Sequence, residues 1–352
     1  MHRGTEAIHE PKDDGGSPTA REPSSKFHLK TVLPNKNIRP HVFHIMRLPS
    51  KKIDEGSLTG AGKKPIGIAW RMALFIATFV LIDVVLTIIL GHFLKRPSND
   101  ATLALSTCLA TGAVNLSAVA SATAVLATLE KKSWFDYGLA GSARTTRFLS
   151  GIVCGFTAIS ALILVLWTTG LIRVEWAEGQ AWKYAGAWAA VFIMAAVFEE
   201  SLLRGYLQAT LTRGIGFWPA SAVLSLIFGL LHATSSSENF VGILNAIVLG
   251  LILCLTLRYT GSLWWAIGFH AAWDWGESAV YGAADSGSIV QHAIFTTRPL
   301  GQVLLSGGSA GPEGSLLILP LMGLLALCIW SRWSAEFHRS RQALLTVGMK
   351  RR

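Results

Sequence analysis

Charged residues are scarce in this chain: Asp, Glu, Lys and Arg make up 15% of its 352 residues, whereas 51% are hydrophobic. So little charge excludes a soluble globular protein of this length. Cysteine is also rare, and its four residues lie in apolar stretches without paired spacing, so we expect small buried side chains, neither disulfides nor metal ligands. Residues 1–20 lack the short apolar core of a cleavable secretion signal, so we expect the first membrane span to direct targeting.

The sequence instead contains long apolar runs separated by short polar breaks. Runs of about 17 to 25 residues have the length that crosses a bilayer as a helix. They predict an all-α fold, a polytopic transmembrane bundle of about eight helices. The predicted spans are residues 68–93, 102–128, 148–171, 185–211, 217–234, 241–258, 262–281 and 315–331.

The chain divides into three predicted regions, which are a disordered basic tail over residues 1–66, a transmembrane domain over 67–332 and a second basic tail over 333–352. Lys and Arg accumulate on the cytoplasmic side of membrane proteins, and their distribution among the loops predicts that both termini are cytoplasmic. The net charge of +10 lies mainly in the two tails. It suits contact with an anionic lipid bilayer and not with nucleic acid. Short loops and a long basic tail favour a bacterial inner membrane.

One predicted span, residues 185–211, contains three charged side chains. Charges are expensive in hydrocarbon, so Glu199, Glu200 and Arg204 are functional-site candidates by default. Residues four apart share a helix face, which allows Glu200 and Arg204 to pair. Glu199 lies about 100° further round the helix and is left free by this pairing.

Two further spans contain pairs of residues with the same four-residue spacing, and each pair includes a histidine. His232 follows Phe228 by four residues, and Asp274 follows His270 by four residues. A lone histidine is more often a packed residue than a catalyst, and a lone Glu–Arg pair can simply bridge helices. Three spans with costly polar groups together favour one shared cavity.

Such a cavity has a definite chemistry. A carboxylate beside an imidazole in a low dielectric can remove a proton from water, and a second imidazole can donate a hydrogen bond to a developing oxyanion. The residues therefore predict hydrolysis of an acyl bond without a covalent nucleophile. A Gly-x-Ser-x-Gly pattern at Gly307, Ser309 and Gly311 is discounted as a nucleophile elbow, because that elbow requires a preceding strand and a following helix.

Three motifs in order, E-E-x-x-x-R at residues 199–204, F-x-x-x-H at 228–232 and H-x-x-x-D at 270–274, resemble the CAAX protease and bacteriocin-processing (CPBP or Abi) family, with a core at about 185–281. This is the family of the type II CAAX prenyl endopeptidases. The resemblance implies an intramembrane endopeptidase acting on a peptide or protein substrate, lipid-modified or not. It also implies the site residues: Glu199 activates water with help from His232, His270 and Asp274 stabilise the oxyanion, and Glu200 with Arg204 shapes the site.

Several alternatives remain beside this interpretation. An ionised Asp274 only accepts hydrogen bonds, so in that state its role is to orient His270. It donates a hydrogen bond to the oxyanion only when it is protonated. The resemblance implies catalysis without a cofactor. In the alternative, His232, His270 and a carboxylate bind zinc and leave one coordination position open. A non-catalytic scaffold or immunity-type protein of the same fold is a second function class. A transporter is a third, although transporters often show paired repeats and residues 185–281 have no clear counterpart earlier in the chain.

Overall fold

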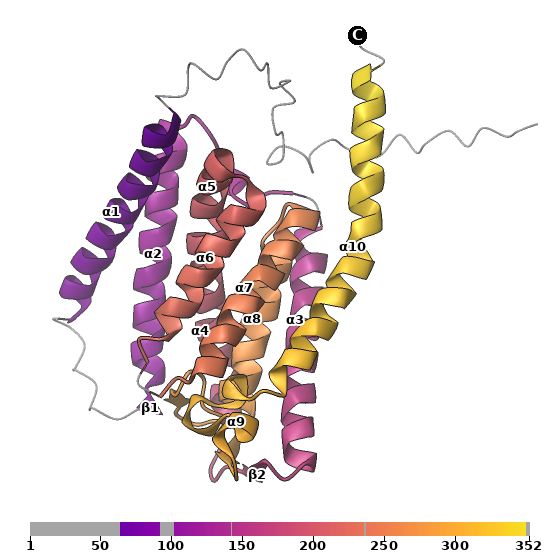
Figure 1. Ribbon diagram of the computed structural model, residues 1–352. Helices are drawn as coiled ribbons and strands as arrows, with labels where there is room; N and C mark the ends of the chain where they lie inside the picture. Colours follow the sequence, from indigo (N-terminus) through magenta and orange to yellow (C-terminus); the bar gives the residue numbers. More distant parts are fainter. Residues whose placement is uncertain (1–63, 92–101, 142, 236, 350–352) are drawn as a thin grey trace, which may run out of the picture. The chain divides into compact units, whose positions relative to one another are not determined.

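The computed structural model describes residues 64–91, 102–141, 143–235 and 237–349 (Figure 1). By internal contacts the chain divides into Met1–Arg39 and Pro40–Arg352, and every described residue belongs to the second unit. Most of these residues are helical, which confirms the predicted all-α class. Residues 1–63 of the tail predicted for residues 1–66 lie outside the described residues. The first helix begins at Lys64, within the predicted tail.

Helices account for nearly all of the described elements, and two of them continue into a π-helical turn. The helices are α1 (Lys64–Gly91), α2 (Leu105–Leu129), α3 (Arg144–Thr168), α4 (Trp182–Glu200), α5 (Gln208–Ile215), α6 (Phe217–His232), α7 (Phe240–Thr260), α8 (Trp264–Asp274), α9 (Val303–Ser306) and α10 (Ile318–Met349). The π-turns are η4 (Ser201–Leu207), between α4 and α5, and η5 (Trp275–Val280), after α8. Short 3-10 turns occur at η3 (Trp134–Asp136), η6 (Gly308–Ala310) and η7 (Pro312–Gly314).

Six helical segments in the described ranges are long and apolar enough to cross a membrane. They are Gly67–Gly91, Leu105–Leu129, Arg144–Thr168, Trp182–Ile215, Phe240–Thr260 and Ile318–Arg339. The other two predicted spans are helical but shorter: α6 has 16 residues, and α8 has 11 before η5 begins. Helix α10 continues to Met349, well beyond the predicted end at residue 331, because the following residues contain no proline and include Ala, Arg and Leu, which favour helix. The four cysteines are free, but only Cys254 is buried as expected; Cys108 and Cys154 are half-buried and Cys328 is exposed.

Glycines bring α3 and α8 into backbone contact. A methyl group on Gly151 would overlap the carbonyl oxygen of Trp265, and one on Gly155 would overlap that of Phe269. From the other side, a methyl group on Gly268 would overlap the carbonyl oxygen of Phe148. Small residues four apart are the usual means by which membrane helices approach closely. This contact fixes the position of α8, whose residues from Trp265 to Trp273 are all buried.

The segment between η5 and α10 attaches to the connection between α6 and α7. It contains the strands β3 (Ile289–Val290) and β4 (Phe295–Pro299), which pair with β1 (Thr102–Leu103) and β2 (Ile172–Trp176), respectively. The hydroxyl of Ser235 donates to the carbonyl of Ser286 at 2.6 Å, and the Asn239 amide donates to the carbonyls of Gly307 and Gly314, at 3.2 Å each. The last residues of α6 are therefore held beside this segment.

Candidate active site

The two adjacent glutamates at the end of α4 occupy different environments. The Glu200 side chain is completely buried, whereas 32% of the Glu199 side chain is exposed. Glu200 Oε1 accepts a hydrogen bond from Arg204 at 3.0 Å and lies 3.2 Å from His270 Nδ1. Glu200 therefore contacts both Arg204 and His270, where the sequence predicted only the pairing with Arg204.

Arg204 is fully buried and is stabilised from two directions. Its guanidinium pairs with Glu200, and its Cζ lies 4.4 Å from the centre of the Phe228 ring, a cation–π contact. Within the described part of the chain, Arg204 Nε and the second guanidinium nitrogen make no hydrogen bond. A buried arginine with so few acceptors depends strongly on its one carboxylate partner.

Both segments that supply charged site residues end in a π-turn. The turn η4 begins directly after Glu200 and contains Arg204, and Gly205 within it has φ −83° and ψ −109°, outside the helical region. The turn η5 begins directly after Asp274. Such turns occur often at functional sites, because the extra residue in the turn redirects the side chains around it. The apolar pattern predicted continuous helix here, and the turns are a correction to that prediction.

His270 has carboxylates beside both ring nitrogens. Its Nδ1 faces Glu200, while Nε2 lies 3.4 Å from Asp274 Oδ2 and 3.6 Å from Glu199 Oε2. Ionised carboxylates only accept hydrogen bonds, so this surrounding favours a proton on each nitrogen. The arrangement therefore favours a positively charged imidazole among the three carboxylates.

His232 reaches the site from the last residue of α6. Its Nδ1 lies 2.8 Å from the carbonyl oxygen of Phe228. A carbonyl only accepts, so this contact assigns the donor role to Nδ1 and leaves Nε2 outside it. The Phe228 ring packs edge-on against both imidazoles, with centroid distances of 4.5 Å to His232 and 6.2 Å to His270.

Glu199 and His232 line one cavity of about 300 Å³. Ser286 and Ser288, from the segment after η5, line the same cavity. The structure thus brings all six sequence-predicted site residues into one region, but only Glu199 and His232 form part of this cavity wall. Asn245 is buried on α7, and its side-chain oxygen makes no hydrogen bond within the described residues.

Several acidic residues near the site were not among the sequence-predicted site residues. Burial raises the pKa of Asp285, against the attraction of His232. The Trp273 indole donates to both Glu277 Oε2, at 3.0 Å, and Glu313 Oε1, at 2.7 Å. Asp285 and Glu313 lie in the segment after η5, outside the predicted spans, so they carried no signal of an intramembrane charge. Glu277 lies inside the predicted span 262–281, where its charge was such a signal.

The Gly-x-Ser-x-Gly pattern finds no support in the geometry. The Gly307–Ser309–Gly311 pattern follows the four-residue helix α9 and is not preceded directly by a strand, and the Ser309 hydroxyl donates to the carbonyl of Ser237 at 3.2 Å. Among the described side chains, no group of three or more His, Cys, Asp or Glu residues has an arrangement that would hold a metal ion.

Comparison with known proteins bears directly on the segment that carries the site. No curated protein matches the chain. Residues 181–276, however, match the family model described as type II CAAX prenyl endopeptidase Rce1-like, and this range contains all three motifs and all six predicted site residues. The resemblance noted in the sequence is thereby confirmed for residues 181–276, and the six long apolar helices of the described ranges agree with an integral membrane protein.

Proposed function

We propose that this protein is an intramembrane endopeptidase in which Glu199 and His232 activate the water that attacks the peptide bond. The observation that carries the proposal is the cavity they share, because Glu199 is the more accessible of the two adjacent glutamates and lies within the Rce1-like domain. A base must lie beside the space where water and substrate meet. Glu200, with its side chain fully buried, does not meet that requirement.

The proposed reaction needs no covalent nucleophile. The Glu199 carboxylate takes a proton from water, assisted by His232 Nε2, as the water oxygen bonds to the carbonyl carbon and the carbonyl electron pair moves to its oxygen. The carbon–nitrogen bond then breaks, and the leaving nitrogen takes the proton held by Glu199. The products are a carboxylic acid and an amine, so every proton is accounted for.

His270 is proposed as the group that stabilises the oxyanion. Glu200 holds Nδ1, which leaves the proton on Nε2 for the oxyanion. Asp274 faces the same Nε2 and orients it in the resting site. Arg204 is a positioning residue, because it contacts Glu200 and Phe228.

A cleavage assay tests this function. The probes are a fluorescence-quenched peptide ending in a farnesylated cysteine and three further residues, and the same peptide without the farnesyl group. We expect purified wild-type protein to cleave a probe, Glu199→Gln and His232→Ala to abolish cleavage, and Glu175→Gln, which removes an exposed carboxylate in β2, to retain it. Full cleavage by Glu199→Gln would overturn the mechanism. Absence of cleavage by the wild type on both probes would favour a binding protein of the same fold.

We propose further that the reaction uses no metal and that Glu199 alone supplies the carboxylate base. Incubation with a chelator followed by assay in metal-free buffer tests this point. An unchanged rate is expected. A loss of rate that zinc restores would contradict it and would favour the alternative in which His232 and His270 are ligands.

The proposed location is a bacterial inner membrane with both chain ends in the cytoplasm. Lys131 and Arg173 lie in segments that this orientation places on opposite sides. In a cysteine-free background, Lys131→Cys should react with an impermeant thiol reagent only in inverted vesicles, and Arg173→Cys only in right-side-out vesicles. The reverse pattern would refute the orientation.

A further inference from the structure

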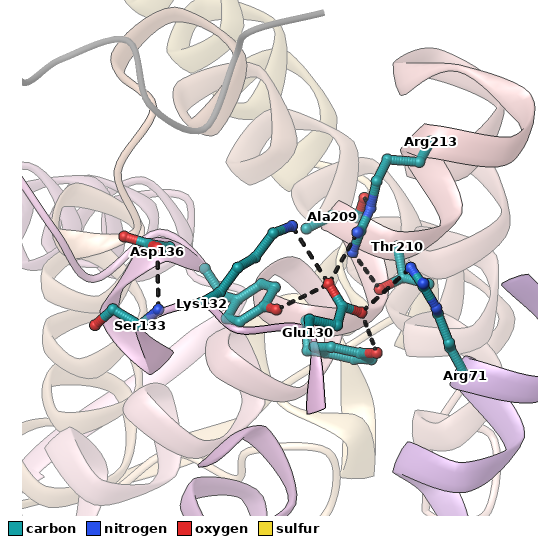
Figure 2. Close-up of polar contacts among 10 residues, drawn as sticks. Arg71, Glu130, Lys132, Ser133, Asp136, Ala209, Thr210 and Arg213 are labelled. Atoms are coloured by element: carbon teal, nitrogen blue, oxygen red, sulfur yellow. Dashed lines mark hydrogen bonds and ion pairs between the residues drawn. The ribbon is translucent and has the colours of Figure 1, made fainter. Parts of the chain in front are cut away.

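A second charged cluster lies away from the candidate active site. Figure 2 shows Arg71 from α1, Lys132 from the turn after α2 and Arg213 from α5 converging on Glu130. The charged nitrogens lie 3.6, 3.3 and 2.9 Å, respectively, from the Glu130 carboxylate oxygens. We call these four residues the Glu130 cluster.

The cluster has more positive charge than its carboxylate can neutralise. Three cations surround one anion, and the hydroxyls of Tyr206 and Tyr137 also approach Glu130, at 2.8 and 3.3 Å. A carboxylate accepts about four hydrogen bonds, whereas each arginine offers five donors and lysine three. Donors therefore remain for a further anion.

Exposure shows where that anion would bind. The Glu130 side chain is 6% exposed, whereas those of Arg71, Lys132 and Arg213 are 48%, 41% and 35% exposed. The carboxylate faces inward and the cations face outward. An incoming ligand therefore meets positive charge first.

The surroundings of the cluster select the source of the anion. Trp70 and Leu129 directly precede Arg71 and Glu130 in the sequence, Ile215 lies two residues after Arg213, and all three are exposed. Apolar side chains of this kind face acyl chains, and tryptophan favours the level of the lipid headgroups. Cations at this boundary, between the ends of membrane helices, suit the phosphate of a lipid. The predicted orientation also places Lys132 and Arg213 on the cytoplasmic side, where anionic lipids attract basic residues.

We propose that the Glu130 cluster binds the phosphate of an anionic phospholipid, with Arg71 and Lys132 as the principal contacts. The charged nitrogens of both lie further from the Glu130 carboxylate than that of Arg213 does, and both side chains are more exposed than that of Arg213. Arg213 is engaged elsewhere, because it also donates to the Ala209 carbonyl at 3.1 Å and to the Thr210 hydroxyl at 3.0 Å.

The test measures lipid binding to the full-length protein in neutral detergent at physiological salt. The probes are short-chain phosphatidylglycerol, phosphatidylcholine of the same chain length and inorganic phosphate. The test variant is Arg71→Gln/Lys132→Gln, in which Arg213 and Tyr206 still hold Glu130. The matched control is Arg173→Gln/Arg298→Gln, which removes two charges that face each other across the β2–β4 pair.

We expect wild-type protein to prefer phosphatidylglycerol. A cation near a lipid surface contributes about 1 kcal/mol, so loss of two should weaken this binding about 30-fold. The control variant should bind like the wild type. Equal weakening in both variants would mean that overall charge alone attracts the lipid, and equal binding of inorganic phosphate would mean that the ligand is a free anion. Either outcome overturns the proposal.

Discussion

Replacement of each of the adjacent glutamates by alanine should separate stability from chemistry. In Glu200→Ala the fully buried Arg204 guanidinium loses its carboxylate partner and retains the Phe228 ring. Removal of one partner of a buried ion pair typically costs about 3–5 kcal/mol, because the remaining charge stays desolvated. In Glu199→Ala the lost contact is a 3.6 Å approach to His270 from a partly exposed side chain. The expected cost there is below about 1 kcal/mol.

The assay is unfolding of purified protein in mixed micelles of increasing sodium dodecyl sulfate, followed by tryptophan fluorescence. Both variants should lose peptide cleavage, but only Glu200→Ala should lose most of its stability. The double variant Glu200→Ala/Arg204→Met removes both charges and should recover much of the loss. Equal destabilisation by the two single variants would refute the reasoning, as would a double variant no more stable than Glu200→Ala.

Three other predictions concern the helix contact, the Glu130 cluster and the last motif. Gly155→Ala should destabilise the protein by about 1–3 kcal/mol, because its methyl group forces α3 away from α8, whereas Gly186→Ala, which has open space around it, should not. Burial raises the pKa of Glu130, but hydrogen bonds from Arg213 and Tyr206 lower it further, to about 2 from an ordinary 4.5. The Glu130 charge therefore stabilises the fold above pH 4.5, and this stabilisation is lost as the pH falls towards 2. In unfolding measurements, the difference in stability between wild type and Glu130→Gln should shrink over that pH interval. Asp274→Asn should retain measurable cleavage, since an amide also accepts a hydrogen bond, whereas Asp274→Ala should reduce kcat.

Local spacing was sufficient to predict one part of the site. The pairing of Glu200 with Arg204 follows from their four-residue separation, and the structure contains it. The separate environment of Glu199 follows from its angular offset on the helix. The limits of most helices were also predictable, because apolar runs have sharp ends.

The remaining features depend on contacts between distant segments. Nothing in the spacing of Arg71, Lys132 and Arg213 indicates that they meet at Glu130, since they belong to three different helices or turns. The contact between Glu200 and His270 joins residues 70 positions apart. The π-turns leave no mark in composition, because an extra residue in a turn changes direction without changing hydropathy.

The turn η4 also makes the segment from α4 to α5 sensitive to the insertion or deletion of single residues. Arg204 and Tyr206 both lie in it. Arg204 donates a hydrogen bond to Glu200 in the candidate active site, and Tyr206 donates one to Glu130 in the Glu130 cluster. Deletion of one residue from this turn would rotate the segment after it by about 100° relative to α4. Neither the apolar length nor the average hydropathy of the span would change appreciably. Single-residue insertions and deletions should therefore be tolerated in the outer loops and eliminated here, so that register, more than apolarity, constrains this span during evolution.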